Sequence, residues 1–417
     1  MTLRLRNTLT REKEPFRTLK AGQVKLFTCG PSTYRPPHLG NYRTFLYEDV
    51  LHRYLELSGY RVQRLMNQTD VEDKAIAEAA EKGVSLEELT RPVEERFIRE
   101  ARLLDMVMPE RPPKSSEAVD QAVRLIQDLM EKGYAYRHEG DVFFDPLKFE
   151  GFGKLFGLDM SRWPKKRRRF RRDTYSGRRW NLGDFILWHR YREKRDGAVY
   201  WDTDIGRGRP AWNIQDPAII TRDLGYRIDI ACGGVDNLYR HHDYTIAVIE
   251  ALTARTFSRF WLHGEHVLVD GAKMSKSKGN IVYLSELLDQ GYEPAHVRFC
   301  LLARHYRETL NLTSRLLRWS REQVEGAREK IGELEEEARK APSRKEDDER
   351  DDTLLQSFRE RMDDDLDLPG AWEALVHRLR SMTHERREGR IEPFEAEAGR
   401  VVRSLEEIDQ VLGVLFA

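Results

Sequence analysis

The strongest constraint on the fold is an alternation of strand and helix patterns in residues 23–83. QVKLFTCG (23–30) is typical of a short strand that ends in a Cys-Gly turn, and an amphipathic helix pattern occupies residues 42–60. A second strand pattern at 61–70 and a second helix pattern at 71–83 follow. Strand, turn, helix, strand and helix in this order are typical of a parallel sheet. We therefore predict an α/β fold.

Polar residues gather where the predicted strands end. Cys29 closes the first strand, His38 lies in the turn before the first helix, and Asn67–Asp70 close the second strand. Ligands of open parallel sheets bind beyond the carboxyl ends of the strands. The sequence therefore predicts that these residues lie near one another at one edge of the sheet.

The middle of the chain predicts further helices and strands. Residues 85–135 have helical patterns, and 134–145 is typical of a hairpin around Glu139 and Gly140. Residues 227–237 predict a strand that ends in a Gly-rich turn. This part of the chain is therefore predicted to contain both helices and strands.

The last third of the chain is predicted to be helical. One long charged helix pattern covers 313–341, and a polar linker at 341–352 has too little apolar content to pack. Two or three further amphipathic helices follow it to the end. These patterns predict that the chain is helical after the α/β part.

Composition narrows the setting of the chain without identifying a partner. Lys+Arg and Asp+Glu are 71 each, so the net charge gives no argument for a polyanionic partner. Three cysteines are too few for a disulfide framework and favour a reducing compartment. No apolar run reaches the roughly 18 residues that span a bilayer, and the N-terminal segment lacks the apolar core of a signal peptide. We therefore expect a cytoplasmic protein with no membrane partner.

One stretch is strongly basic. KKRRRFRR (165–172) fits a solvated loop or a segment that binds nucleic-acid phosphates, because clustered Arg and Lys give affinity that is independent of sequence. The second interpretation assigns RNA contacts to Arg167, Arg168, Arg169, Arg171 and Arg172.

Two turns carry residue types that suit phosphates. GAKMSKSKGN (271–280) places clustered lysines between glycines after a hydrophobic run, and PPHLGN (36–41) lies between the first strand and the first helix. Each turn alone is compatible with an ordinary loop. However, lysine is a compact charge on a flexible stem, and helix N-termini commonly bind phosphates. Together the two turns favour a phosphate site.

This pair of turns, in this order, resembles the two signature motifs of class I aminoacyl-tRNA synthetases. Segments across nearly the whole chain resemble cysteinyl-tRNA synthetases, among them NTLTREKEPF, TCGPSTY, NQTDVEDKAI, GDVFFD, GRPAW and DDDLDLPGA. The resemblance implies a Rossmann-type parallel-sheet catalytic domain at 1–310 with a connective insertion at about 85–205. A stem and helical bundle would occupy 311–417. The implied activity is ATP-dependent formation of an aminoacyl-adenylate and transfer to tRNA.

The resemblance also implies roles for residues around ATP. His38 and Asn41 would contact the phosphates, and Asn41 stands where many members of the family carry a second histidine. Lys273 and Lys276 would hold the departing pyrophosphate, and Asp236 would accept hydrogen bonds from the ribose. The other residues expected at the nucleotide are Gly40, Gly233, Gly234, Met274, Ser275 and Ser277. Mg²⁺ is the expected companion of ATP.

The amino-acid site departs from the pattern of the family. Members of the family select cysteine with zinc held by two Cys, one His and one Glu. Here Cys29 and His241 match, whereas Asp216 replaces the second Cys and Thr245 replaces the Glu. The other residues expected around the amino acid are Gly30, Thr69 and Trp212.

Three hypotheses follow for this site. Zinc persists on Cys29, Asp216 and His241, as in an open three-ligand site. Alternatively, zinc is lost and Asp216 recognises a different side chain as an ionised acceptor, or the site has decayed. Because carboxylate is a poorer zinc ligand than thiolate, we predict substoichiometric zinc and no strong preference for free cysteine.

The acceptor also has alternatives. Members of the family continue past the bundle with an anticodon-binding domain, which we expect to be absent because the sequence ends at VLGVLFA. The cysteine ligase of mycothiol biosynthesis is similarly short, so a small-molecule amine is an alternative acceptor to tRNA. A catalytically idle paralogue that binds RNA or regulates a partner is a third hypothesis. The retained His38, Lys273, Lys276 and Asp236 argue against idleness.

Overall fold

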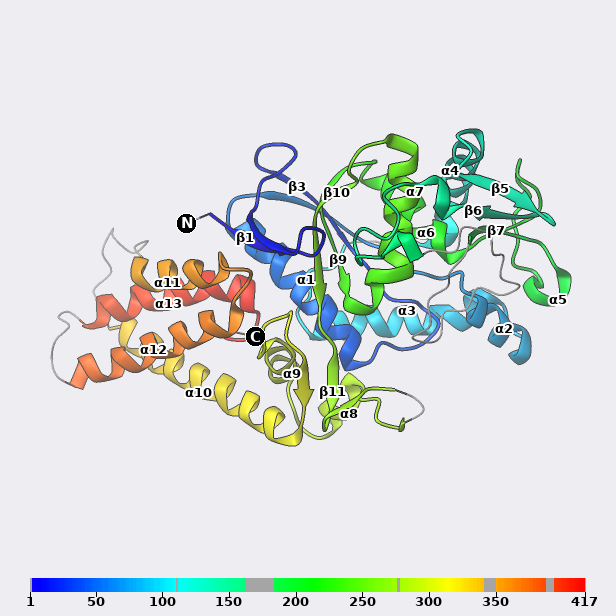
Figure 1. The fold of residues 1–417 in the computed structure, drawn as a ribbon. Coiled ribbons are helices and arrows are strands. Elements are labelled where there is room, and N and C mark those ends of the chain that lie inside the picture. The colour runs from blue at the N-terminus through cyan, green and yellow to red at the C-terminus, as the bar shows by residue number, and fades with distance from the viewer. Residues whose placement is uncertain are drawn as a thin grey trace.

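A parallel sheet forms the centre of the molecule, with the strand order β10-β9-β3-β4 (Figure 1). The structure is a computed structural model that describes residues 2–109, 112–162, 184–275, 278–340, 350–387 and 394–416. The sheet strands are β3 (Gln23–Thr28), β4 (Arg61–Met66), β9 (Ile228–Gly234) and β10 (Ser258–Gly264). The α/β fold predicted from the alternating pattern is confirmed.

Helices α1 (Leu39–Leu57) and α2 (Asp73–Lys82) follow β3 and β4 in the predicted order. The second strand ends at Met66, before the predicted end at Asp70. Its continuation leaves the sheet because the N–H of Gln68 donates to the carbonyl of Pro113, outside the sheet. The residues after Met66 therefore form a loop at the carboxyl edge.

The connective part adds helices and an antiparallel sheet of order β5-β6-β7-β8. Glu139 and Gly140 turn the predicted hairpin in left-handed conformations with φ of 50° and 86°. The basic stretch 165–172 lies outside the described residues. The elements here are α3 (Leu86–Leu103), η1 (Ser115–Ala118), α4 (Val119–Glu131), β5 (Ala135–His138), β6 (Asp141–Phe144), η2 (Pro146–Lys148), η3 (Met160–Arg162), β7 (Phe185–Arg190), α5 (Glu193–Asp196) and β8 (Gly208–Pro210).

Helix α6 leads into strand β9, and two short turns and helix α7 connect β9 to β10. Helix α6 carries Asp216 into the protein interior, and the turn before α7 carries His241. These elements are α6 (Trp212–Asp223), η4 (Val235–Asn237), η5 (Leu238–His242) and α7 (Asp243–Thr253).

A small sheet of order β12-β11-β13 carries the start of the lysine-rich turn at 271–280. Lys273 ends its short outer strand. The strand β13 begins at Leu310, the last residue of the predicted catalytic domain, so the small sheet joins the two predicted parts of the chain. The elements are β11 (Val267–Val269), β12 (Ala272–Lys273), α8 (Leu284–Asp289), α9 (Pro294–Leu302) and β13 (Leu310–Leu312).

A helical bundle closes the chain, as the sequence predicts (Figure 1). Its buried residues share one hydrophobic core with α1 and α9, so the bundle packs directly on the catalytic part. An N-terminal hairpin that the sequence analysis did not predict pairs β1 (Arg4–Asn7) with β2 (Glu12–Pro15). The bundle helices are α10 (Ser314–Ala338), α11 (Asp352–Met362), α12 (Leu368–Arg387) and α13 (Phe394–Leu412).

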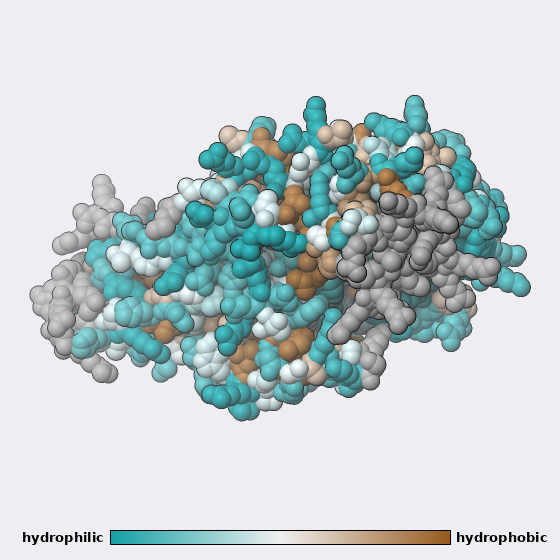
Figure 2. All heavy atoms as spheres, in the orientation of Figure 1, coloured by the Kyte–Doolittle hydropathy of each residue, from teal (hydrophilic) through white to brown (hydrophobic). Residues whose placement is uncertain are grey.

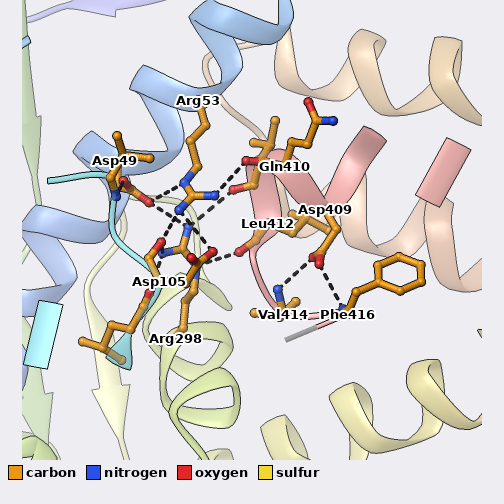
Figure 3. Close-up of polar contacts among 12 residues, drawn as sticks. Asp49, Arg53, Asp105, Arg298, Asp409, Gln410, Leu412, Val414 and Phe416 are labelled. Atoms are coloured by element: carbon orange, nitrogen blue, oxygen red, sulfur yellow. Dashed lines mark hydrogen bonds and ion pairs between the residues drawn. The ribbon is translucent and has the colours of Figure 1, made fainter. Parts of the chain in front are cut away.

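Arg298 of α9 anchors the end of the bundle to the catalytic helix α1 (Figure 3). Its guanidinium is fully buried and donates to the carbonyl of Leu412 at 2.6 Å, to the carbonyl of Leu104 at 2.8 Å and to Asp49 Oδ2 at 2.8 Å. Burial raises the pKa of Asp49, but the neighbouring arginines outweigh it and hold this pKa below its usual value. The end of α13 is therefore fixed to α1, the helix that begins in the turn PPHLGN (36–41).

Hydrophilic residues dominate the described surface on the face drawn in Figure 2, and hydrophobic residues appear there as small patches near the centre. A helix that is both long and apolar enough to cross a membrane is not found among the described residues.

Candidate active site

A hollow of about 270 Å³ lies at the carboxyl ends of the central strands. Four separate segments of the chain line it: the turn between β3 and α1 with the first turns of α1, the turn at the end of β9, the turn between β10 and β11, and the end of β12. The predicted residues that it brings together are Cys29, Gly30, His38, Gly40, Asn41, Gly234, Asp236, Lys273 and Met274. The carboxyl edge of the sheet is thus where the candidate residues meet.

His38 caps the N-terminus of α1 in a reciprocal arrangement with Asn41. Nδ1 of His38 accepts from the N–H of Asn41 at 3.3 Å, and the side-chain oxygen of Asn41 accepts from the N–H of His38 at 3.0 Å. Burial lowers the pKa of His38, so the ring is neutral at pH 7. With Nδ1 as acceptor, Nε2 carries the proton and can donate to an anion.

Gly40 makes the position of the His38 ring possible. A Cβ atom at residue 40 would lie 2.9 Å from Cε1 and 3.0 Å from Nδ1 of that ring. Contacts this short force one of the two groups to move. Glycine at this position therefore lets the imidazole fold back over the first turn of the helix.

The glycines at the end of β9 lead into another part of the hollow, which Gly234 and Asp236 line. A Cβ at Gly233 would lie 2.6 Å from His242 Cε1, and a Cβ at Gly234 would lie 2.6 Å from Asp236 Oδ1. The hydroxyl of Tyr47 donates to the carbonyl of Gly233 at 2.8 Å and fixes this turn to α1. Asp236 is exposed at the hollow, so its carboxylate can accept hydrogen bonds from a bound ligand.

Lys273 supplies a cation to the hollow from the loop after β11. Its Nζ lies 3.5 Å from Nε2 of His266. The side chain of Asn280 shapes the loop, since it accepts from the N–H of Ser275 at 2.9 Å and donates to the carbonyl of Lys273 at 3.3 Å. Lys276 and Ser277, which the sequence analysis placed at the same site, lie outside the described residues.

Cys29, Asp216 and His241 meet beside the hollow. His241 Nε2 lies 2.8 Å from Asp216 Oδ2, and Cys29 Sγ lies 3.4 Å from His241 Nε2 and 3.9 Å from Asp216 Oδ2. Donor atoms around a tetrahedral zinc ion are about 3.4–3.6 Å apart, given bonds of about 2.0–2.3 Å. The three predicted ligands are therefore spaced closely enough to hold one metal ion.

Burial raises the pKa of the Cys29 thiol well above its usual value, and the charge of Asp216 raises it further. Trp212 stacks on the ring of His241, with ring centroids 4.1 Å apart. Because its pKa is raised in this way, Cys29 stays a protonated thiol at neutral pH when no cation lies beside it.

Two asparagines also belong to this cluster: Asn67, which the sequence places near Cys29 at the sheet edge, and Asn237, which was given no role from the sequence. Asn67 donates to Asp216 Oδ1 at 2.8 Å and accepts from the N–H of Gly30 at 2.9 Å. Asn237 Nδ2 lies 3.7 Å from Cys29 Sγ. The place of Asn67 directly after β4 was the available sequence signal, because strand ends meet at the ligand edge.

The remaining predicted residues, Thr245, Thr69 and Gly30, contact backbone carbonyls near this cluster. The hydroxyl of Thr245 donates to the carbonyl of His241 at 3.0 Å, one helical turn back. The N–H of Thr69 donates to the carbonyl of Pro31 at 3.1 Å, and Gly30 packs so tightly that a Cβ there would lie 1.7 Å from the carbonyl oxygen of Asn67. Thr245, at the position where the resemblance to cysteinyl-tRNA synthetases implies a Glu, is therefore bonded to the turn that precedes its helix.

His242, which follows His241 in the chain, pairs with a further histidine, His263. His242 Nδ1 is 2.8 Å from His263 Nε2, and His263 Nδ1 is 2.9 Å from the hydroxyl of Thr8. One ligand atom from each of Cys29, His241 and His242 falls within 4.8 Å of the others. Burial lowers the pKa of His263 to about 3 and that of His242 well below its usual value. Both rings are therefore neutral at pH 7.

Comparison with known proteins decides the family. Residues 15–322 match the family described as tRNA synthetases class I (C) catalytic domain. A cysteine–tRNA ligase of Chlamydia felis (strain Fe/C-56) is 38% identical over 418 residues, which cover 99% of this chain and 86% of that relative. The chain belongs to the cysteinyl-tRNA synthetase family. It is thus an ATP-dependent ligase of the class I synthetase type, as the resemblance of its motifs implies.

Further relatives agree with this family. A cysteine–tRNA ligase of Brachyspira hyodysenteriae (strain ATCC 49526 / WA1) is 38% identical over 331 residues, covering 79% of this chain and 69% of the relative. Mycobacterium tuberculosis methionyl-tRNA synthetase bound by methionyl-adenylate has a TM-score of 0.63 at 14% identity, covering 94% and 92% of the two chains. Agrobacterium radiobacter K84 LeuRS in a ternary complex with tRNA and LeuAMS has a TM-score of 0.69 at 12% identity, covering 96% and 85%. These two structures share the fold.

Proposed function

We propose that this member of the cysteinyl-tRNA synthetase family converts an amino acid to its adenylate and transfers the aminoacyl group to tRNA. One observation carries the proposal: the capped N-terminus of α1, with His38 and Asn41, faces Asp236 and Lys273 across one hollow. The N–H groups and the dipole of a helix N-terminus favour negative charge. The phosphates of ATP are an anion that suits this end of the hollow.

The first step asks the chain to position two substrates and to neutralise charge. The carboxylate oxygen of the amino acid attacks the α-phosphorus of ATP, and pyrophosphate leaves with the electron pair of the bond that breaks. His38 Nε2 donates to a phosphate oxygen, Lys273 and Lys276 hold the pyrophosphate, and Asp236 accepts from the ribose hydroxyls. Preorganised contacts of this kind act mainly on the transition state. Mg²⁺ bound to ATP supplies further positive charge.

In contrast to the expectation from sequence that free cysteine is not strongly preferred, we propose cysteine as the amino acid, selected at Cys29, Asp216 and His241. One sulfur, one nitrogen and one carboxylate oxygen form a donor set that suits zinc, and their spacing fits a single ion. When bound, zinc supplies an open ligand position for the thiolate of a substrate. Trp212 keeps the ring of His241 in its orientation by stacking on it.

The partners of Asp216 favour metal binding over direct recognition of a cationic substrate. Oδ1 of Asp216 accepts from Asn67, and Oδ2 contacts His241, so each oxygen already has a partner within the chain. A metal ion can replace the proton between Asp216 and His241 without disturbing Asn67. Carboxylate in place of thiolate weakens the site, so we expect zinc to be lost readily during purification.

For the acceptor we propose tRNA, with a small-molecule amine as the second candidate. The basic stretch 165–172 supports tRNA because it offers a dense positive charge. Neutralising Arg167, Arg168 and Arg169 should weaken tRNA binding and flatten its dependence on salt, and leave RNA-free activation unchanged. A wild type without salt-dependent affinity for tRNA would favour the amine.

We also propose that the protein is cytoplasmic. Cys29, Cys232 and Cys300 are all free thiols, which suits a reducing compartment. Fractionation of the producing cells, followed by detection of the protein, tests this location.

The exchange of labelled pyrophosphate into ATP tests the assignment of the ATP site. His38→Ala and Lys276→Ala should each slow this exchange about a hundredfold, because each removes a group that stabilises charge in the transition state. Circular dichroism should show an unchanged fold. Wild-type rates in both variants would contradict the roles given to these residues.

A further inference from the structure

A second hollow of about 340 Å³ adjoins the first at the phosphate end. Both hollows share Pro31, Ser32, His38 and Asn41, so a ligand at the N-terminus of α1 borders on both. The residues that line only the second hollow include Tyr34, Arg35, Glu72, Ser275 and Tyr283. The second hollow is therefore an extension of the active site on the far side of His38.

Arg35 is the one Lys or Arg among the described residues that line this second hollow. Its guanidinium lies 4.6 Å from the centre of the Tyr34 ring, and Nη2 contacts Glu78 Oε2 at 2.5 Å. The side chain is 47% exposed, so it can move. Arg35 thus stands at the mouth of the hollow with its charge within reach of a ligand.

The ion pair with Glu78 leaves Arg35 available. Glu78 is also paired with Lys82 of the same helix, at 2.7 Å, and keeps that partner if Arg35 turns away. An ion pair whose arginine is open to solvent contributes little to stability. A multiply charged anion can therefore draw the guanidinium from Glu78 at low cost.

None of the four residues that border both hollows brings a positive charge. His38 is neutral at pH 7, and the side-chain oxygen of Asn41 is committed to the helix cap. Among the described residues that line the second hollow, Arg35 is therefore the one positive charge that an anion meets. Guanidinium is well suited to this, because its planar fork can make two parallel hydrogen bonds to phosphate.

We propose that Arg35 is the phosphate-binding residue of an anion subsite in the second hollow. The proposal rests on the proposed function. The phosphate can come from the pyrophosphate that leaves ATP or from the terminal nucleotides of the tRNA. Both sources present the same chemistry to Arg35, and both must lie near the adenylate during one of the two steps.

Three variants test the subsite: Arg35→Gln, Arg35→Lys and Glu78→Gln. The first arm measures KM for sodium pyrophosphate in amino-acid-dependent exchange without RNA. The second arm measures KM for a cysteine tRNA transcript in the full reaction. In Arg35→Gln, one of the two KM values should rise about tenfold or more, because a charge-assisted hydrogen bond is lost. Arg35→Lys should restore part of the loss.

Glu78→Gln separates ligand binding from a structural role. If Arg35 binds phosphate, removing the competing carboxylate should leave the same KM unchanged or lower it. If Arg35 only fastens the turn to α2 through Glu78, then Glu78→Gln should raise KM as Arg35→Gln does, and that result overturns the proposal. Unchanged KM values for both substrates in Arg35→Gln overturn it as well. A wild type without any amino-acid-dependent exchange would instead refute the proposed function itself.

Discussion

Replacing Gly40 by alanine should lower the activity of the enzyme and leave the stability of its fold nearly unchanged. The new Cβ would lie 2.9 Å from Cε1 and 3.0 Å from Nδ1 of His38, so the ring must swing away. It then loses the hydrogen bond from the N–H of Asn41, and Nε2 is displaced from the proposed phosphate site. Losing one such group in the transition state costs about 3 kcal/mol, or a hundredfold in rate.

The same substitution should not destabilise the fold. Gly40 lies in the first turn of α1, and alanine is favoured over glycine in a helix by up to about 1 kcal/mol. The lost cap offsets this gain by about 1 kcal/mol, so the free energy of unfolding should change by less than about 1 kcal/mol. Activity should therefore fall about a hundredfold at nearly constant stability.

The assay is pyrophosphate exchange together with urea unfolding on the same preparations. Gly326→Ala is the matched control, because Gly326 lies inside α10 and a Cβ there meets no atom within 4 Å. This control should gain up to about 1 kcal/mol of stability and keep the wild-type exchange rate. A Gly40→Ala enzyme with wild-type exchange would refute the role of the His38 ring.

Three further predictions concern the interior and the metal site. The folded protein favours the neutral form of His263, because burial lowers its pKa to about 3, against about 6.5 in the unfolded chain. The contribution of His263 to the free energy of unfolding is therefore full above pH 6.5 and is lost as the pH falls towards 3. Between pH 7 and pH 5 the loss should be about 2 kcal/mol in urea unfolding, and His263→Gln should flatten this slope. Arg298→Met should lower the free energy of unfolding by about 3–5 kcal/mol, because Asp49 and several buried carbonyls lose a partner; an unchanged urea midpoint would contradict the anchor. Asp216→Cys should raise zinc affinity at least tenfold in a competition titration with a chromogenic chelator, since thiolate is the softer ligand, whereas equal or weaker affinity would argue against Asp216 as a ligand.

The fold was predictable where the signals are local. The strand, turn and helix at 23–60 follow from short-range patterns, and the predicted meeting of Cys29 with His38 follows from the rule on strand ends. The helix cap at His38 needs residues only three positions apart. Such features require no knowledge of distant parts of the chain.

Contacts between distant segments could not be predicted from these patterns. Asn67 and Asp216 are 149 positions apart, and Arg298 and Leu412 are 114 apart, yet both pairs are hydrogen-bonded in the interior. An arginine or an asparagine in a sequence is usually exposed, and only the folded chain shows which partners bury it. The early end of β4 at Met66 has a similar origin, since its competing partner is the carbonyl of Pro113.

The proposed function makes cysteine the amino acid that this chain converts to an adenylate, with the substrate thiol bound at Cys29, Asp216 and His241. The most direct measurement is pyrophosphate exchange with each of the twenty amino acids, on enzyme of measured zinc content, before and after treatment with a chelator. We expect cysteine to give the fastest exchange, chelation to abolish it, and added zinc to restore it. Faster exchange with another amino acid, or cysteine-dependent exchange that survives complete removal of metal, would contradict the claim.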